Sequence, residues 1–279
     1  MNRRRFIAIA AAAATAPFAA QAITRWRGVA LGAEAEITLR GAGGEAALAH
    51  AVKTLRRVEA EFSLYLPGSA LSRLNRDGAL APSPMFRALT KLCDHLHDAT
   101  GGLFDPTVQA LWSALASGQD AEAAEALLGW RRVSRGDVIR LDPGQSLTFN
   151  GIAQGYAADL VSEALREAGF AETLVNIGEF RAGAGRWRIG VATPAGDLLD
   201  VVGLRGDAVA TSSPAATWVG GRSHILSAQG RRPRWSTVSV KAPSAAVADG
   251  LSTGLCLADE AEMARIAGRF PEVEIRRWR

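Results

Sequence analysis

The apolar positions of this chain follow two spacings, and each spacing predicts a different kind of element. Along residues 45–61 apolar side chains recur three or four positions apart, as at Leu48, Val52 and Leu55, which is typical of an amphipathic helix. Residues 29–39 read VALGAEAEITL instead, which predicts a strand with a glycine bend. Helices and strands are therefore mixed from the start of the sequence.

The same spacings predict further elements that do not alternate strictly. Helices are expected at residues 69–74, 85–99 and 156–168 and after a capping serine at position 244. Strands are expected at residues 146–149, 174–177, 187–192, 199–204, 207–211, 224–226, 236–241 and 273–275. Neither a linker nor a repeat of fixed period interrupts the chain. The pattern predicts an α+β fold with a large, partly antiparallel sheet and no doubly wound order.

Residues 1–22 have the composition of an export signal. Consecutive arginines from Arg3 precede an alanine-rich apolar run, and the segment ends Ala20-Gln21-Ala22, which suits signal peptidase. The arginine pattern resembles a twin-arginine signal. A membrane anchor is the alternative, but the run from Phe6 to Ala16 is too short for a bilayer core of about 30 Å. We therefore expect cleavage, a periplasmic mature chain of residues 23–279 and no membrane span.

Composition and charge narrow the function classes. The precursor has 279 residues, 48% hydrophobic and 22% charged, which is ordinary for a globular chain with a real core. Its net charge of +4 includes the three arginines of the predicted signal, so the mature chain is left near +1. A nearly neutral chain gives little support to binding of nucleic acid or of a membrane surface.

The cysteines and histidines do not predict a metal centre. Cys93 and Cys256 each lie among apolar residues at helical spacing, which favours buried free thiols, although an oxidising compartment would also permit a bridge. His95 and His97 are two positions apart, so their side chains diverge on a helix. A zinc site is not expected.

Two oxygen-bearing side chains share one face of the helix that follows Ser244. Asp249 and Thr253 are four positions apart near the beginning of that helix. Oxygen ligands suit Mg²⁺, which commonly keeps waters or substrate phosphates in its other positions. The alternative is an acid that stabilises the helix dipole and a threonine bonded back to the chain.

A glycine-rich turn, FNGIAQG from Phe149 to Gly155, stands where a predicted strand gives way to a helix. Gly151 and Gly155 would let the backbone approach a ligand closely, and amides at a helix N-terminus attract phosphate. The turn is neither GxGxxG nor a P-loop. Taken alone, the two glycines of this turn can be explained by the geometry of the chain as well as by binding of a ligand.

Seven blocks taken together resemble, in order, the ApbE family of FAD:protein FMN transferases. The resemblance covers nearly the whole mature chain, through FSLYLPGSALSRLN, TGGLFDPTVQALW, FNGIAQGYAADLVSEALREAG, LVNIGEF, ATSSPA, SHILS and KAPSAAVADGLSTGLCLAD. It implies a single compact, T-fold-like α+β unit with a largely antiparallel sheet packed with helices. It also implies Mg²⁺-dependent cleavage of FAD, with transfer of FMN to a Thr or Ser hydroxyl of an exported acceptor protein and release of AMP.

The resemblance also implies roles for particular residues. Mg²⁺ would be held by the carbonyl of Gly151 together with Asp249 and Thr253. His224 would act as the general base on the acceptor hydroxyl, a role that suits the near-neutral pKa of imidazole. The positions that match flavin-contacting residues are Leu31, Ser69, Ala70, Leu71, Asp105, Gln154 and Ile225.

This chain departs from the family pattern at several positions. The family usually has Lys or Glu at the position of Gln154, and a second glycine followed by an acid where this chain has Glu179 and Phe180. Asp-Pro is usual where residues 227–228 are Ser-Ala. The implied metal ligands are unchanged, whereas the flavin and acceptor side differs.

Two other functions stay open at the level of sequence. The same metal could hydrolyse FAD to FMN and AMP with water in place of the acceptor hydroxyl, or the chain could bind flavin without catalysis. A Ser/His/Asp hydrolase is not expected, because the TSSPA segment around Ser212 lacks the GxSxG nucleophile elbow.

Overall fold

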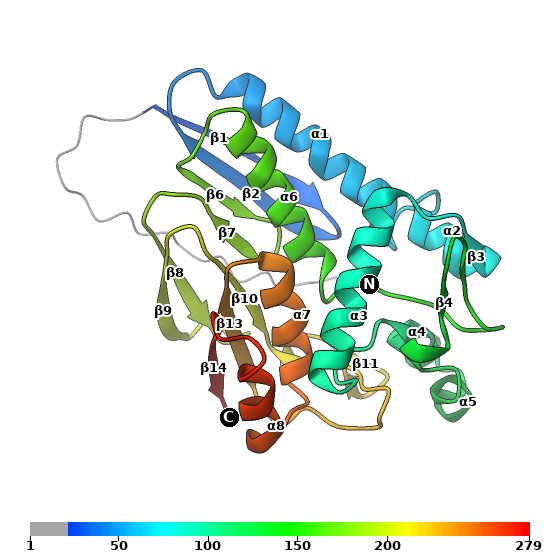
Figure 1. Ribbon diagram of the computed structural model, residues 1–279. Helices are drawn as coiled ribbons and strands as arrows, with labels where there is room; N and C mark the ends of the chain where they lie inside the picture. Colours follow the sequence, from blue (N-terminus) through cyan, green and yellow to red (C-terminus); the bar gives the residue numbers. More distant parts are fainter. Residues whose placement is uncertain (1–21) are drawn as a thin grey trace.

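A seven-stranded sheet is the centre of the computed structural model, which describes residues 22–279 (Figure 1). Its strand order is β1-β2-β6-β7-β10-β13-β14, and every neighbouring pair is antiparallel. The strands are β1 (Ile23–Ala30), β2 (Ala33–Arg40), β6 (Thr173–Asn176), β7 (Phe180–Ala182), β10 (Ala208–Ser212), β13 (Thr237–Ala242) and β14 (Glu274–Trp278). The predicted α+β fold with a largely antiparallel sheet is confirmed.

Three helices cover one face of this sheet. They are α1 (Glu45–Phe62), α6 (Ala153–Glu167) and α7 (Ala245–Leu255), and α6 lies between the other two (Figure 1). Their apolar faces bury Leu55 and Leu251 completely in the main core, because the helical spacing puts apolar side chains toward the strands. The core therefore fills the space between the helices and the sheet.

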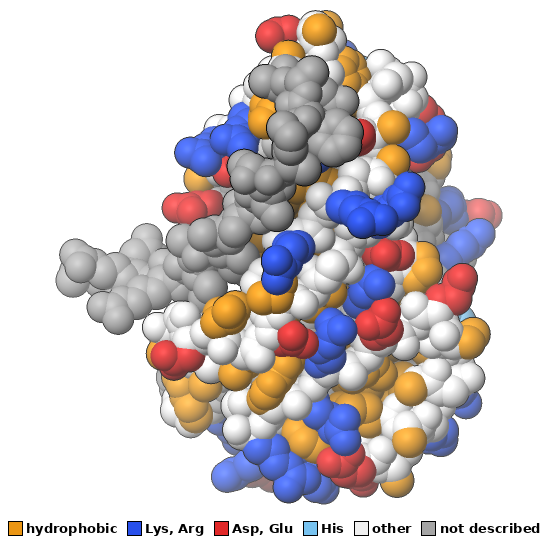
Figure 2. Space-filling view, turned by 90° about the vertical axis from the view of Figure 1, so that its left-hand side faces the viewer, with side chains coloured by type: hydrophobic (Ala, Val, Ile, Leu, Met, Phe, Trp, Pro, Cys, Tyr) orange, Lys and Arg blue, Asp and Glu red, His pale blue; other side chains and the backbone are white. Residues whose placement is uncertain are grey.

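A two-stranded hairpin covers part of the opposite face. It consists of β8 (Trp187–Ala192) and β9 (Leu198–Leu204), and it buries Ile189 and Val202 against Val209 of β10. On the face in Figure 2, basic and acidic side chains are interspersed rather than gathered by sign. That surface agrees with the nearly neutral charge expected for the mature chain.

The remaining elements pack around the end of the sheet where α3 meets α7 (Figure 1). The helices are α2 (Ala70–Asp77), α3 (Pro84–Thr100), η1 (Pro106–Val108), α4 (Gln109–Ser117), α5 (Ala121–Glu125), η2 (Trp130–Arg132), η3 (Pro214–Ala216) and α8 (Glu260–Ala267). The short strands are β3 (Ala79–Leu80), β4 (Ser134–Arg135), β5 (Ile139–Arg140), β11 (Trp218–Val219) and β12 (Arg222–Ser223).

The N-terminal half differs from the predicted elements in two places. The single bent strand at residues 29–39 is a hairpin, in which Leu31 and Gly32 form a two-residue turn with φ of 48° and 77°. The strand predicted at residues 146–149 does not form. The amide and carbonyl of Leu147 bond instead to the Asn75 side chain, at 2.8 Å each, so they need no neighbouring strand.

Smaller differences concern element boundaries. The helix predicted to begin at Tyr156 begins at Ala153. The strand predicted at residues 224–226 does not form, because β12 ends at Ser223. Cys93 and Cys256 are both buried and free, as the apolar spacing favoured. Burial raises the pKa of both thiols, which keeps them protonated and unreactive.

The predicted export signal lies outside the described residues, apart from Ala22. Within residues 22–279, no helix combines the length and apolarity needed to cross a membrane.

Candidate functional site

The glycine-rich turn leaves one backbone carbonyl free at the start of α6. In a regular helix the amide of Gly155 would donate to the carbonyl of Gly151, four positions earlier. It donates instead to Asp249 Oδ2 at 3.0 Å. Within residues 22–279 no backbone amide donates to the Gly151 oxygen. The hydrogen bond to Asp249 thus frees the Gly151 carbonyl for another partner.

Close helix packing explains why both positions are glycine. A Cβ on Gly155 would lie 2.2 Å from the carbonyl oxygen of Ala245, so α6 and α7 touch backbone to backbone at this point. A Cβ on Gly151 would lie 2.9 Å from Thr253 Oγ1. Both distances are shorter than real contacts allow, and glycine therefore brings the Gly151 backbone directly beside the Thr253 hydroxyl.

The contacts of α7 exclude the helix-dipole explanation for Asp249. The helix begins at Ala245, and its first amides are satisfied by Asp159, which accepts from Ala245 N at 2.9 Å and from Ala246 N at 3.0 Å. Asp249 follows one turn later. The residue that bonds back to the chain is Ser252, whose hydroxyl donates to the Asp249 carbonyl at 3.0 Å. The Thr253 hydroxyl is not used in that way.

Asp249 is a buried carboxylate with an unused oxygen. It is 3% exposed, and burial raises its pKa to about 7, with the amide of Gly155 acting in the opposite direction. No hydrogen bond from the described residues reaches its Oδ1 atom. Because an isolated buried carboxylate is costly, a bound cation would stabilise its charged form.

The residues present fit Mg²⁺ as a mixed set of oxygens. The described residues contain no group of three His, Cys, Asp or Glu side chains that could hold a metal ion. A cation here would need the free carbonyl of Gly151 and the hydroxyl of Thr253 in addition to Asp249. Such a set supplies hard oxygen ligands and leaves positions for substrate phosphates, as Mg²⁺ prefers.

Gln154 lies against the turn between β6 and β7. A Cβ on Gly178 would be 2.7 Å from the Gln154 side chain, and Gly178 has φ of 90°. The backbone amide of Gln154 donates to no acceptor among the described residues. It is therefore an available donor at the N-terminus of α6, beside the Gly151 carbonyl.

Four of the positions predicted to contact flavin have structural roles here. Ser69 caps α2 by accepting from Ser72 N at 3.0 Å, and its hydroxyl donates to the Ser63 carbonyl at 2.7 Å. Ala70 and Leu71 are buried in the main core. Leu31, in the β1–β2 turn, is buried too. These roles come from helix capping and packing, and flavin contact at these positions stays a prediction.

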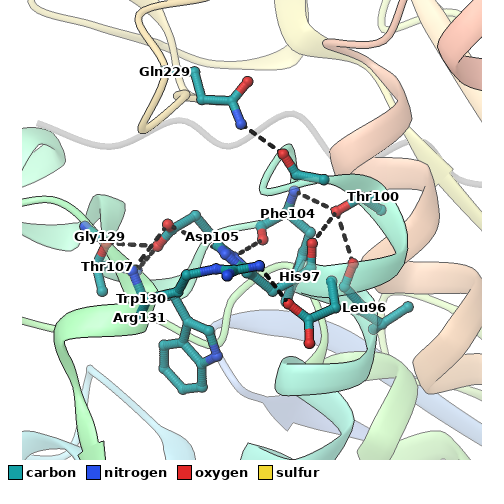
Figure 3. Close-up of polar contacts among 12 residues, drawn as sticks. Leu96, His97, Thr100, Phe104, Asp105, Thr107, Gly129, Trp130, Arg131 and Gln229 are labelled. Atoms are coloured by element: carbon teal, nitrogen blue, oxygen red, sulfur yellow. Dashed lines mark hydrogen bonds and ion pairs between the residues drawn. The ribbon is translucent and has the colours of Figure 1, made fainter.

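Asp105 is held on both oxygens by its own surroundings (Figure 3). Its Oδ1 accepts from the amide of Thr107 at 2.8 Å and from the Thr107 hydroxyl at 2.5 Å, while Oδ2 accepts from Trp130 N at 3.2 Å. His97 Nδ1 lies 3.8 Å from Oδ2 and 3.0 Å from the Phe104 carbonyl. Asp105 thus orders the turn before η1, and its predicted contact with flavin is not tested by these bonds.

His224 follows β12, and its ring interacts with the backbone of both Thr217 and Pro214. Its ring Nδ1 lies 3.2 Å from the Thr217 oxygen, and its backbone amide donates to the same oxygen at 3.1 Å. Because a carbonyl only accepts, Nδ1 carries the hydrogen and Nε2 keeps its lone pair. Burial lowers the pKa of this imidazole below its ordinary value. The lowered pKa keeps the imidazole of His224 neutral near pH 7.

A cavity of about 660 Å³ is lined by both chain neighbours of His224. Its walls include Ser223 and Ile225, the two neighbours of His224, together with Leu111 and Trp218. Gly151, Asp249 and Thr253 do not line this cavity. The chain after His224 is tied to the turn before Asp105, since Gln229 Nε2 donates to the Gly101 carbonyl at 2.7 Å (Figure 3). The structure thus brings the three predicted metal ligands together, while Ile225 lines a cavity to which none of the three contributes.

Sequence reasoning missed two residues next to the predicted cation ligands. Ser212, at the end of β10, places its hydroxyl 2.8 Å from Ser252 Oγ and 3.5 Å from Thr253 Oγ1. Glu179 accepts from the amide of Thr211 at 3.0 Å, one residue along β10 from Ser212. The only signal in the sequence was that Glu179 occupies a position where the family pattern has glycine.

Known proteins resemble this chain over most of its length. The model of the ApbE family matches residues 31–276. The FAD:protein FMN transferase of Salmonella typhimurium is 27% identical over 230 residues, which are 70% of this chain and 66% of that protein. The FAD:protein FMN transferase of Vibrio cholerae is 30% identical over 240 residues, which are 75% of this chain and 72% of that protein.

A solved structure extends the similarity to the fold. The flavinyl transferase ApbE of Pseudomonas stutzeri, in its apo form, has a TM-score of 0.78 and 27% identity, covering 91% of this chain and 90% of that chain. The match to solved structures therefore spans nearly the whole molecule, whereas the alignment to the Salmonella protein spans less than two thirds of its length.

Proposed function

This chain belongs to the ApbE family, and from that membership we propose that it transfers FMN from FAD to a Thr or Ser hydroxyl of a target protein and releases AMP. One observation carries the proposal for this chain. The Gly155 amide donates to Asp249 and leaves the Gly151 carbonyl free beside the Thr253 hydroxyl. Three oxygens of different chemical type thus meet at the N-terminus of a helix.

These oxygens would hold Mg²⁺. Gly151, Asp249 and Thr253 are the residues that would bind the ion, and a bound Mg²⁺ supplies neutralising charge for the diphosphate of FAD. The N-terminus of α6 supports the same substrate group, because the free amide of Gln154 can donate to a phosphate oxygen. The chain's own contribution is to position the diphosphate and to stabilise its negative charge.

His224 would accept the proton of the acceptor hydroxyl. Its Nδ1 hydrogen is held by the Thr217 carbonyl, so Nε2 is the atom that can take a proton. The acceptor oxygen forms a bond to the FMN phosphorus while the bond to the AMP oxygen breaks, and AMP carries away the electron pair. The reaction leaves a phosphoester between FMN and the acceptor protein.

Incubation of the purified protein with FAD, Mg²⁺ and a candidate acceptor tests the proposal. The acceptor should carry a Thr/Ser flavinylation motif, and its Thr→Ala variant is the control. Fluorescent flavin that stays on the denatured acceptor, but not on the control, is the expected result. Free FMN without labelled acceptor would instead indicate hydrolysis of FAD, and unchanged FAD would indicate binding alone; either result would overturn the transferase proposal.

The predicted export signal supports a periplasmic location for the reaction. Residues 1–22 combine arginines, an apolar run and a small-residue end, which together favour twin-arginine export and an exported acceptor. Fractionation of cells that express the full chain, with Arg3, Arg4 and Arg5 changed to Lys as the control, measures this directly. We expect the unmodified chain in the periplasmic fraction, and equal distribution of both chains would argue against twin-arginine export.

A further inference from the structure

Glu179 is a buried acid that accepts a hydrogen bond through one of its two carboxylate oxygens. It lies in the turn between β6 and β7 and is 9% exposed. Its Oε2 atom accepts from the amide of Thr211 at 3.0 Å. No hydrogen bond or ion pair from residues 22–279 reaches its Oε1 atom. One carboxylate oxygen of this largely buried side chain thus has no partner within the described chain.

The Thr211 contact places Glu179 beside the predicted cation ligands. Thr211 immediately precedes Ser212, whose hydroxyl contacts both Ser252 and Thr253 of α7. On the other side of the turn, Gly178 packs against the side chain of Gln154 at the start of α6. Glu179 therefore lies against β10, in a turn that packs on the start of α6 and one residue along β10 from the contact with Thr253.

Glu179 and Asp249 form a pair of buried acids without a basic partner. Burial and the charge of Asp249 both raise the pKa of Glu179. The nearby acid Asp159 differs, because it caps α7 and also pairs with Arg181 at 3.2 Å. No Lys, Arg or His of the described chain forms an ion pair with Glu179 or Asp249. Within the described chain the two carboxylates have only backbone amides as partners, Thr211 N for Glu179 and Gly155 N for Asp249.

We propose that Glu179 is a second carboxylate ligand of the divalent cation that Gly151, Asp249 and Thr253 would hold. This inference rests on the proposed function, since it takes that cation site as its starting point. Two carboxylates match the double positive charge of Mg²⁺, and the unpartnered oxygens of Glu179 and Asp249 are the atoms available for it. The family pattern has glycine at position 179, so this ligand would be a property of this chain.

Metal titration of the full chain, without FAD or acceptor, tests the inference. Mg²⁺ binding is measured by calorimetry, and Mn²⁺ binding by the loss of the free-ion electron paramagnetic resonance signal. Glu179→Gln should weaken binding of both ions by at least about tenfold. Glu163→Gln, which changes an exposed acid on α6, is the matched control and should bind as the unmodified chain does.

Thermal unfolding separates a ligand from a structural acid. Gln at position 179 can still accept from Thr211 N through its amide oxygen, while it removes one of two like charges. In EDTA we therefore expect the Tm of Glu179→Gln to equal or exceed that of the unmodified chain. In saturating Mg²⁺ the unmodified chain should gain more in Tm than the variant does.

The outcomes of the two measurements are distinct. An unchanged metal affinity in Glu179→Gln, or a Tm lowered equally in EDTA and in Mg²⁺, would overturn the ligand role while leaving the transferase proposal intact. Failure of the unmodified chain to bind either ion would overturn the cation site itself. In that case both proposals would lose their metal, and the flavin-transfer assay would decide whether the transferase activity exists without it.

Discussion

The amide of Gly155 donates to the Asp249 carboxylate across 94 positions of sequence, at a distance of 3.0 Å. This single bond joins the N-terminus of α6 to the second turn of α7. It leaves the Gly151 carbonyl free, and the other oxygen of Asp249 accepts no hydrogen bond from the described residues. The candidate cation site depends on this contact more than on any other.

Close packing at Gly155 predicts a measurable cost for a single methyl group. In Gly155→Ala the Cβ would meet the Ala245 carbonyl at 2.2 Å, so α6 and α7 must separate. We expect a loss of about 1–3 kcal/mol in the free energy of unfolding, measured with urea, as for other overpacked sites. Gly136→Ala is the control, because nothing lies within 4 Å of its added Cβ. Equal stability of the two variants would contradict the close approach.

Asp249→Asn should separate folding from activity. The Asn side chain can still accept from the Gly155 amide, but it carries no charge for a cation. We expect Mg²⁺ binding and flavin transfer to be lost, while the far-UV circular dichroism spectrum stays that of the unmodified chain. Stability in EDTA should be retained or increased, because a buried charge has been removed. Full transfer activity in this variant would remove Asp249 from the site.

The pKa of His224 predicts how the transfer rate changes at acid pH. Burial lowers its pKa below the ordinary 6.5, so the ring is neutral at pH 7 and becomes protonated only as the pH falls through its folded value. We expect the transfer rate to fall below about pH 6.5, and His224→Ala to reduce it by about 10²–10⁴-fold.

The lowered pKa of His224 also predicts how the stability of the fold depends on pH. A histidine whose pKa is lowered by folding stabilises the fold above its unfolded pKa, and that stability is lost as pH falls toward the folded value. The Tm difference between the unmodified chain and His224→Gln should therefore shrink between neutral pH and pH 5.

A transfer rate that does not change between neutral pH and pH 5 would exclude His224 as the base.

Asp105 offers a test of structural against flavin-binding roles. Asn at this position can keep only one of the two acceptor oxygens that serve Thr107 and Trp130. We expect Asp105→Asn to lower the free energy of unfolding by about 1–3 kcal/mol, the cost of a buried donor left unsatisfied. FAD affinity is measured in parallel by fluorescence titration. Weaker FAD binding with unchanged stability would instead support direct contact with flavin.

The amino-acid pattern alone established the elements whose causes are local. The helix expected at residues 85–99 forms as α3 because apolar spacing, a capping Ser83 and the terminal Gly101 all act within the segment itself. The pairing of Asp249 with Thr253 follows from helical geometry in the same way. The ordered blocks identified the family, since several of them together are specific where each alone is not.

Only the folded chain decided relationships between segments distant in sequence. The Gly155–Asp249 bond, the approach of Glu179 to Asp249 and the contact of Ser212 with Thr253 join different helices and strands. The order of residues along the chain does not give such distances, because they depend on how closely helices pack on a sheet. For the same reason the sequence showed Glu179 only as a difference from the family pattern, whereas the tertiary structure places it against Thr211, next to Ser212 and the candidate cation site.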